Sequence, residues 1–322
     1  MRLSVPAESA GARLDRFLAG ALSHASRASI MKYLKEGLGL VNGLPAKPGL
    51  ALRGGDVVEL PGFGERIKEI RRGVARGVPA VPRVRRAPEG IVVLHQDDHL
   101  LVIDKPPGVV MHPGKGHREE GLDRMLARSF GKATRLVHRL DRDTSGVLVA
   151  ARGHPESARR LTEAFREQDV RKSYLALVAG CPEPPRGTID LPLLDTQLVA
   201  SKVRVDPAGR RAITDYETLE SWRGFSWLRL NPRTGRKHQL RVHLAAIGHP
   251  LAVDRIYGRR RKLKLHDMRP DLDLTWKDPL VLARTPLHAE SITLRHPGTG
   301  REVTFTAPLP ADLAGVLNIL RG

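Results

Sequence analysis

Two carboxylates, Asp141 and Asp143, lie in a stretch of the chain that is crowded with other ionisable and hydroxyl side chains. Residues 135–149 read RLVHRLDRDTSGVLV, and the apolar, β-branched run at the end predicts a short buried strand. Catalytic and binding groups are common in loops that a rigid strand holds in place. We expect Gly146 to relieve a tight backbone bend where the loop joins the strand. An aspartate in such a loop could act as a nucleophile or as a general base.

Local physics leaves several interpretations of the two acids open. Residues two apart in an extended segment point to the same face, so the acids could form a like-charge pair. The flanking Arg139 and Arg142 instead favour two ionised acids with cationic partners. The acids could also lie in a solvated turn, in which the two hydroxyls that follow bond to the backbone. A metal site built from His138 and Asp141 is weaker, because a bare His-x-x-Asp is not specific and no second pair of ligands stands nearby.

The string HRLDRDTSG at residues 138–146, followed by the apolar run, resembles the signature of the RluA-type pseudouridine synthases. This resemblance implies that Asp141 is the catalytic residue and that Arg139 beside it contacts the substrate. Asp143 falls at a position that varies in the family, so we expect no catalytic role for it. Such a long string in this order is more specific than the spacing of the acids alone.

Two further strings resemble motifs of the same family. VIDKPPGVVMHPG, residues 102–114, resembles the first motif and suggests that Lys105 contacts a backbone phosphate of RNA; a surface lysine beside a turn is the alternative. RKSYLALVAG, residues 171–180, predicts a strand and resembles the second motif, which places the active-site aromatic at Tyr174. A uracil stacked on that ring would gain ~1–3 kcal/mol. Without the motif, a half-buried strand tyrosine would be the simpler interpretation.

TGRKHQLRVH, residues 234–243, closely resembles the third motif. The resemblance implies that Arg241 pairs with Asp141, which would keep the carboxylate ionised through a fork geometry that lysine lacks. A phosphate-binding stripe is the alternative interpretation of the basic residues. The other substrate contacts implied by this motif and by a late Leu-His-Ala motif are Arg236, His238, Gln239 and Leu287. The leucine would pack against the tyrosine and the target base. The family uses no metal, so no histidine is expected to be a ligand.

The charge balance favours a polyanionic partner. The 322-residue chain has 54 Lys+Arg against 35 Asp+Glu, a formal net charge of +19, which favours nucleic acid or an anionic membrane surface. No apolar run approaches the ~20 residues that cross a bilayer, and the N-terminus lacks the apolar core of a signal peptide. Cys181 is the only cysteine, so we expect a reducing cytosol and RNA rather than a membrane as the partner.

Three regions of the chain differ in pattern. Residues 1–62 predict two small helices and a hairpin, and they resemble the αL RNA-binding domain; the basic helices could otherwise be a solvated surface. Residues 63–88 are rich in Arg, Gly and Pro and predict an extended basic linker. Residues 89–322 carry the catalytic motifs. The resemblance implies an α+β fold, with a mixed, largely antiparallel central sheet, flanking helices and a catalytic cleft, plus a small α/β N-terminal domain.

Hydrophobic periodicity predicts the main elements of the catalytic region. They are a hairpin over 91–103, helices over 121–129 and 155–167, strands over 147–149, 171–180 and 227–230, a helix carrying 238–247, and a closing hairpin over 285–310. The basic string at 259–266 predicts a loop.

The resemblance implies an isomerase that converts uridine to pseudouridine in structured RNA. The reaction cuts the bond from uracil N1 to the ribose and joins C5 to the same sugar carbon, so neither a cofactor nor a metal is needed. Extruding the base from folded RNA costs a few kcal/mol. We expect large-subunit ribosomal RNA, rather than transfer RNA, as the target of a monomeric cytoplasmic protein. The alternatives are a non-catalytic RNA-binding assembly factor and a glycosidase-like hydrolase, which needs a second acid such as Asp143 or Asp254.

Overall fold

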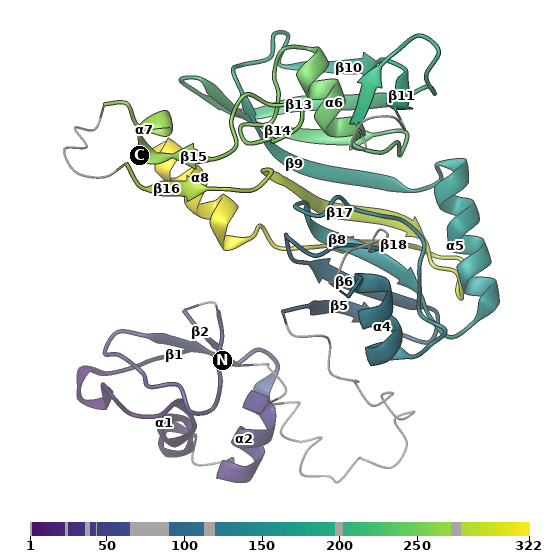
Figure 1. Cartoon of the computed structure of the whole chain (residues 1–322). Coiled ribbons are helices and arrows are strands. Elements are labelled where there is room, and N and C mark those ends of the chain that lie inside the picture. Colours follow the sequence, from purple (N-terminus) through teal and green to yellow (C-terminus); the bar gives the residue numbers. More distant parts are fainter. Residues whose placement is uncertain are drawn as a thin grey trace. The chain divides into compact units, whose positions relative to one another are not determined.

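The structure is a computed structural model of the chain, and it describes residues 2–22, 25–35, 39–42, 44–64, 90–112, 120–196, 202–271 and 278–322. These residues belong to two compact units, residues 1–83 and 84–322 (Figure 1). The predicted linker, residues 63–88, lies outside the described residues apart from its first two positions. Within the described ranges, no helix combines the length and the apolar character needed to span a membrane.

The first unit packs two helices against a small sheet. The helices are α1 (Leu14–Ala21) and α2 (Arg27–Lys35), and the strands are β1 (Arg2–Ser4), β2 (Leu40–Val41), β3 (Leu44–Pro45) and β4 (Val57–Glu59), in the order β1-β4-β2-β3. Leu14, Leu18 and Ile30 are buried with Val58 in one core. The two predicted helices and the strands after them are present, whereas β1 was not predicted.

Two basic residues of this unit have an internal partner. The buried Asp15 accepts hydrogen bonds from Nε of Arg13 and Nη2 of Arg27, each at 3.0 Å. These bonds, led by the one from Arg13, lower the pKa of Asp15 to about 2. The basic surface that α1 and α2 offer to a polyanion is therefore smaller than the sequence alone indicated.

Ten strands form one sheet in the second unit. They are β5 (Val92–Gln96), β6 (Leu100–Lys105), β7 (Arg135–Leu136), β8 (Ser145–Ala151), β9 (Arg171–Ala179), β10 (Arg186–Asp190), β13 (Ile213–Trp222), β14 (Phe225–Pro232), β17 (Leu287–Arg295) and β18 (Glu302–Thr306). The order is β10-β13-β14-β9-β17-β8-β6-β5, with β18 on β17 and β7 on β8. Only β8 and β17 pair in parallel among these strands. The prediction of a mixed, largely antiparallel sheet with flanking helices is confirmed.

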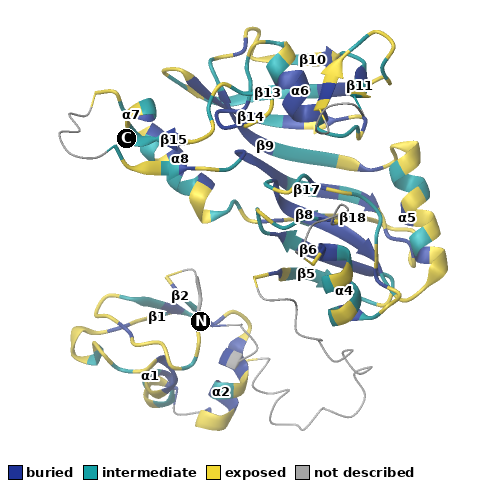
Figure 2. Ribbon diagram, in the orientation of Figure 1, coloured by how far each residue is buried: buried dark blue, intermediate teal, exposed yellow. Residues whose placement is uncertain are grey.

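The helices cover both faces of the sheet. On β8, Leu148 belongs to the core under α4 (Leu122–Phe130), while Val147 and Val149 belong to the core under α5 (Pro155–Glu167). On β9, Ala176 packs with α6 (Gln239–Ala246), and Leu177 packs with α8 (Ala311–Arg321). Alternate side chains of a strand point to opposite faces, which explains this division. Figure 2 shows β8 buried along its length and α5 exposing one side.

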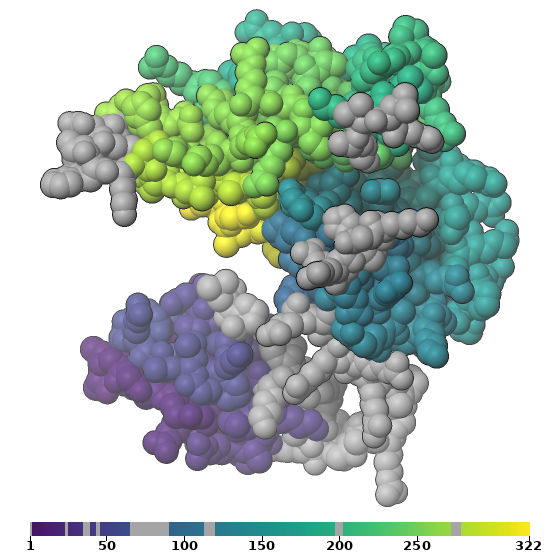
Figure 3. All heavy atoms as spheres, in the orientation of Figure 1, coloured from purple at the N-terminus to yellow at the C-terminus, as the bar shows by residue number. Residues whose placement is uncertain are grey.

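Several elements differ from the predictions. The predicted loop at 259–266 contains β15 (Leu263–Lys264), which pairs with β16 (Leu280–Leu282), and the start of α7 (Leu265–Met268). The loop prediction was therefore wrong: Leu263 and Met268 are buried, and their burial orders a segment whose other residues are mostly charged. The strands β10, β11 (Leu193–Thr196) and β12 (Lys202–Val205) and the helix α8 were not predicted. In Figure 3 the yellow C-terminal atoms lie directly against green atoms of the same unit.

Candidate active site

Asp141 lies in a loop whose backbone carbonyls are held by a buried ammonium group. Nζ of Lys105 donates to the carbonyl oxygens of Pro106 at 3.0 Å, Arg142 at 2.9 Å and Thr144 at 2.9 Å. Lys105 is 0% exposed, and burial lowers its pKa to about 8. The prediction that Lys105 contacts an RNA phosphate was wrong, and so was the alternative of a surface lysine, because all three ammonium protons point into the protein.

A second cation, Arg284, binds the backbone carbonyl of Asp143, which lies between those of Arg142 and Thr144. Nη1 of Arg284 donates to the carbonyl oxygen of Asp143 at 3.2 Å. Nε and Nη2 of the same guanidinium bind the carboxylate of Asp312, on α8, at 2.5 and 2.8 Å. Three consecutive carbonyls, at positions 142 to 144, thus bind a positively charged group. Such charge-assisted bonds restrict the loop that carries Asp141.

Gly146 permits the close approach of β8 and β17 beside the loop. Its φ is +111°, and a Cβ added there would lie 2.2 Å from the carbonyl oxygen of Ala289. The expected bend at this glycine is confirmed, and no other residue fits the space. One position earlier, Oγ of Ser145 lies 3.0 Å from Nδ1 of the buried His288. The strand pairing brings Leu287 next to the loop, although the two lie far apart in the sequence.

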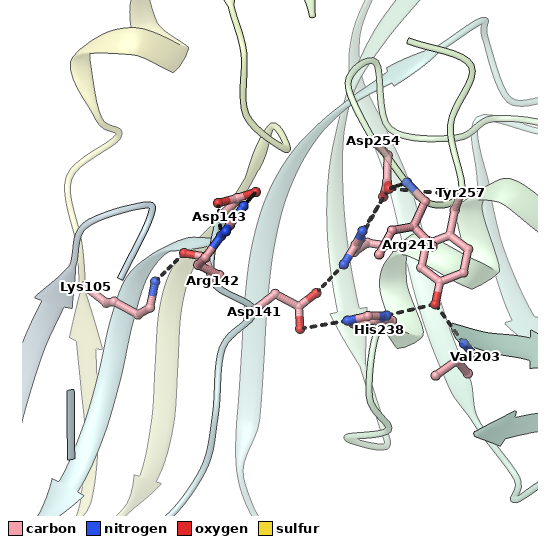
Figure 4. Close-up of polar contacts among 10 residues, drawn as sticks. Lys105, Asp141, Arg142, Asp143, Val203, His238, Arg241, Asp254 and Tyr257 are labelled. Carbon is pink, nitrogen blue, oxygen red and sulfur yellow. Dashed lines mark hydrogen bonds and ion pairs between the residues drawn. The ribbon is translucent and has the colours of Figure 1, made fainter. Parts of the chain in front are cut away.

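Arg241 joins two carboxylates that are distant in the sequence (Figure 4). Its Nη1 donates to Oδ2 of Asp141 at 3.0 Å, while Nε and Nη2 donate to Asp254 at 2.7 and 2.8 Å. The predicted contact between Arg241 and Asp141 is present. Asp141 therefore pairs with an arginine 100 positions away rather than with the flanking Arg139 or Arg142. The alternative of a phosphate-binding role for Arg241 is wrong, because protein carboxylates occupy its guanidinium.

Asp254 holds that guanidinium in place and was missed as a site residue. Burial alone would raise the pKa of Asp254, but hydrogen bonds from Arg241 and from the backbone N–H groups of Ile256 and Tyr257 lower it. Burial alone would likewise lower the pKa of Arg241, and its two carboxylate partners raise it. Asp254 and Arg241 are consequently both charged at neutral pH.

His238 approaches Asp141 from the other side. Its backbone is in the left-handed region (φ 54°), just before α6, and its Nε2 lies 3.8 Å from Oδ1 of Asp141. Nδ1 lies 2.8 Å from the hydroxyl of Tyr257, which accepts a hydrogen bond from the N–H of Val203 at 2.9 Å. The Tyr257 proton is thus available to Nδ1, which would leave the ring proton on Nε2, facing Asp141. Burial lowers the pKa of His238, so the ring is neutral near pH 7.

A cavity of about 370 Å³ opens beside Asp141. Tyr174 on β9 and Leu287 on β17 line it, and the two lie in one hydrophobic cluster. Burial, reinforced by the charge of Asp141, raises the pKa of Tyr174, so the phenol keeps its proton at neutral pH. The size suits a small planar group. The cavity thus brings the carboxylate of Asp141, the ring of Tyr174 and the side chain of Leu287 close together.

Asp141 is the one carboxylate among the described residues that line this cavity. Asp143 turns away and pairs with Nε of Arg142 at 3.0 Å, so the like-charge pair is wrong. A turn is present, since the N–H of Thr144 donates to the carbonyl oxygen of Asp141 at 3.2 Å. The expected bonds from the hydroxyls to the backbone are not, because Oγ1 of Thr144 has no hydrogen-bond partner and Oγ of Ser145 contacts His288. Hydrolysis by two carboxylates needs a second acid near the reacting bond, and neither Asp143 nor Asp254 reaches the cavity lining.

The residues predicted to contact the substrate differ in their exposure and in their hydrogen-bond partners. Gln239 is 4% exposed, and its amide bonds to Thr234, Arg236, Ile213 and Thr214. Its polar atoms fasten the turn at 234–236 to β13, and the side chain also lines the cavity, so contact between Gln239 and the substrate stays a prediction. Arg139 is exposed, whereas Arg236 is half-buried and its Nε donates to the carbonyl oxygen of Arg211 at 3.1 Å. Both line the cavity, where their roles as substrate contacts stay predictions, as do those of His238 and Leu287.

Two cavity residues were not assigned a role from the sequence. Nε2 of His138 accepts a hydrogen bond from the N–H of Val149 at 2.9 Å, and the ring stacks on Phe165 at 4.5 Å. Burial, aided by the charge of Lys172, lowers the pKa of His138 to about 3, which leaves a neutral ring at pH 7. Lys172 itself faces the cavity from β9. An alternating strand places it on the same side as Tyr174, and this spacing is the signal that could have identified it.

Comparison with known proteins points to one family. A family model described as RNA pseudouridylate synthase matches residues 99–246. The chain is 35% identical to ribosomal large subunit pseudouridine synthase D of Xanthomonas campestris over 98% of this chain and 91% of that protein, and 35% identical to synthase C of Salmonella typhi over 99% and 96%. The solved structure of human RNA pseudouridylate synthase domain containing 4 covers 71% of this chain and 93% of its own, with 30% identity and a TM-score of 0.56.

Proposed function

The chain belongs to the RNA pseudouridylate synthase family, and on that premise we propose that it modifies large-subunit ribosomal RNA with Asp141 as its catalytic residue. The ribosomal target is supported by the two bacterial relatives, whose names give large-subunit synthases C and D. The carboxylate role is supported by one observation above all: Asp141 faces the cavity while Arg241 holds its second oxygen at 3.0 Å.

The isomerisation breaks the bond from uracil N1 to C1′ of the ribose and forms a bond from C5 to C1′. Overall, the proton on C5 is lost and N1 gains one, so the atoms balance without a cofactor. Asp141 acts either as the nucleophile at C1′ or as the base that removes a sugar proton. Both roles require an ionised carboxylate in a fixed direction, which the Arg241 guanidinium provides. Arg241 is thereby a positioning residue that Asp254 holds in turn.

The target base is extruded into the cavity, where it stacks on Tyr174 and packs against Leu287. Extrusion costs a few kcal/mol, and stacking on one aromatic ring returns ~1–3 kcal/mol. Arg139 and Arg236, which line the cavity, contact the neighbouring nucleotides. His238 orients the free side of Asp141 and contacts the substrate. No step in this scheme uses a metal.

Residues 1–62 act as an αL-type RNA-binding domain, joined by the basic segment 63–88 to the catalytic domain 89–322. The two helices packed on a small sheet, in a chain whose formal charge over all 322 residues is +19, support an RNA-holding role for this part. The protein acts as a monomer in the cytoplasm during ribosomal RNA processing, where its substrate is made. An assembly factor without catalysis would account for the charge but would leave the carboxylate and its two supporting residues unexplained.

The test compares Asp141→Asn with Asp143→Asn. Pseudouridine is detected by carbodiimide-dependent reverse-transcription stops in ribosomal and transfer RNA from a strain that lacks the protein and carries each variant. We expect Asp141→Asn to abolish the stop while RNA binding persists. Asp143→Asn, which removes a neighbouring acid that points away from the cavity, keeps it. A stop that survives in the Asp141 variant would refute the catalytic role, and a stop found only in transfer RNA would refute the ribosomal target.

A further inference from the structure

Lys172 is a cation in the cavity that has no acidic partner. Its side chain is only partly exposed and lines the cavity two positions before Tyr174 on β9. No carboxylate of the described residues lies within 4.0 Å of its Nζ, and burial lowers its pKa. A Cβ added to Gly235 would lie 3.6 Å from this Nζ, so the ammonium lies against the turn at 234–236.

The neighbours of Lys172 do not neutralise its charge. His138 is neutral, because burial holds its pKa at about 3 and Nε2 accepts from a backbone N–H. Tyr174 keeps its proton, and the carboxylate of Asp141 is bound to Arg241. By contrast, Lys237, which lines the same cavity, binds Asp195 at 3.1 Å. Charged groups withdrawn from water are normally paired, so Lys172 has the properties of a group whose partner is an anionic ligand.

The cavity continues toward a second basic hollow. Thr162 and Arg166 of α5 line both spaces. The second hollow has a volume of about 560 Å³ and is also lined by Arg135, His154 and Arg159. Part of this charge is compensated on α5, since Arg159 pairs with Glu156 and Glu163 and Arg166 lies 3.5 Å from Glu163 and 3.4 Å from Glu167. The lining of the hollow still holds more arginines than acids, so a strand that leaves the cavity on the Lys172 side would meet excess positive charge there.

We propose that Lys172 binds a phosphodiester next to the target uridine and that the RNA strand leaves this site along α5, past Arg166. The inference rests on the proposed function and adds to it the subsite for the RNA backbone. A phosphate matches the site better than a uracil carbonyl does, because only the phosphate carries the charge that balances a partly buried ammonium. The contact would fix the ribose of the extruded nucleotide while Asp141 reacts at C1′.

The test removes the charge of the RNA phosphodiester and the charge of Lys172, first separately and then together. Short RNAs that contain the target uridine are prepared with a single uncharged methylphosphonate at each linkage around it, and kcat/KM is measured for wild type and Lys172→Met. In wild type we expect one linkage at which the neutral group lowers kcat/KM by about tenfold or more, the loss of one hydrogen bond to a charged group. Lys172→Met loses a similar factor on natural RNA and nothing further at that linkage.

Lys237→Met is the matched control, since it removes a lysine from the same cavity whose partner is Asp195; this variant should keep the full sensitivity at the critical linkage. Lys172→Arg should also keep the sensitivity at that linkage. In Lys172→Met, the slope of the logarithm of the RNA-binding constant against the logarithm of the salt concentration should fall in magnitude by about 0.7, the value for one phosphate of a single strand. Lys172→Gln replaces Lys172→Met should the latter fail to fold. Equal sensitivity to every linkage in wild type and the neutral variants would overturn the proposal.

Failure of this inference is distinguishable from failure of the proposed function. Wild-type pseudouridine formation in the natural RNA tests the function, and only the linkage-by-variant comparison tests Lys172. Modification that proceeds without linkage-specific coupling leaves the function standing and removes the phosphate subsite. If wild type modifies transfer RNA instead, the ribosomal target fails and the same comparison is made on that RNA. If wild type modifies no RNA, both proposals fail together.

Discussion

Arg241→Lys tests whether the fork shape of the guanidinium, rather than its charge, organises the site. Arg241 is 7% exposed and makes three bonds, at 2.7 and 2.8 Å to Asp254 and at 3.0 Å to Asp141. A lysine ammonium at the end of one flexible chain reaches one of these carboxylates, so two of the three bonds are lost. At roughly 1.5–3 kcal/mol for each bond to a charged group, the variant loses about 3–6 kcal/mol of unfolding free energy.

The same change separates Asp141 from its orienting partner. We expect the ammonium to remain with the more deeply buried Asp254, which leaves Asp141 without a fixed direction. Loss of one preorganised charged contact in an active site typically lowers kcat by about 100-fold or more. Urea unfolding measures the first effect, and single-turnover pseudouridine formation with saturating enzyme measures the second, free of any change in RNA affinity.

Arg233→Lys is the matched control for this prediction. Arg233 also binds a carboxylate with two nitrogens, Nε and Nη2 to Asp215 at 2.7 and 2.8 Å, but its side chain is 60% exposed. Exposed ion pairs contribute about 0–1 kcal/mol, so this variant should unfold nearly like wild type and keep its activity. The reasoning would be refuted if Arg241→Lys lost no more stability than Arg233→Lys and kept wild-type kcat.

Two further predictions concern the backbone around Asp141. The pKa of Lys105 is lowered from an ordinary 10.5 to about 8, so between these pH values the unfolded chain binds one more proton and the unfolding free energy increases with rising pH. The unfolding free energy of wild type relative to Lys105→Met should therefore rise by roughly 1–3 kcal/mol from pH 7 to pH 10.5. A difference between the two proteins that stays constant with pH in urea titrations would contradict the assignment. Gly146→Ala should abolish folding or cost more than about 3 kcal/mol, because its Cβ would overlap the carbonyl of Ala289. Gly108→Ala, which has a similar positive φ of +88° but open space, should cost only about 1–2 kcal/mol in the same assay.

The sequence predicted the elements with strong periodicity and missed those that depend on tertiary contacts. α5 and β9 follow directly from their apolar spacing. The spacing of Leu313, Val316, Leu317 and Leu320 in α8 was an available signal, since these residues form its buried face. The short strands β10 to β12 have mixed burial and little periodicity of their own. Their pairing partners order them, and that information lies elsewhere in the chain.

The site could be predicted only where a resemblance joined distant segments. No local pattern connects Asp141 with Arg241, which is 100 residues away. Lys105 and Gln239 were assigned to the substrate because they stand in strings that resemble motifs of the family. The fold buries both side chains, and their polar atoms form hydrogen bonds with backbone and side-chain groups of the protein. Burial is a property of the assembled sheet, so a motif can identify such a residue without revealing what it contacts.

The positive charges of the catalytic unit divide into two classes by burial. Lys105, Arg241 and Arg284 have little solvent exposure, and their protons bind carbonyls and carboxylates that position Asp141. Exposed cations such as Arg139 retain the freedom to bind phosphates. Changes in the first class should therefore lower stability and kcat with little effect on salt dependence. Changes in the second should lower RNA affinity and the salt slope while the chemical step persists.

Lys172 falls between these classes. Lys172 is partly buried, like the cations that position Asp141. Unlike them, it has no carboxylate or carbonyl partner among the residues that the structure describes. A partly buried ammonium without an acidic partner destabilises the free protein slightly, because it has lost part of its hydration. An anion that binds to this ammonium removes the penalty and stabilises the folded protein. Substrate should consequently raise the melting temperature of wild type more than that of Lys172→Met, which connects the charge distribution of the cavity to the step at which the target nucleotide is bound.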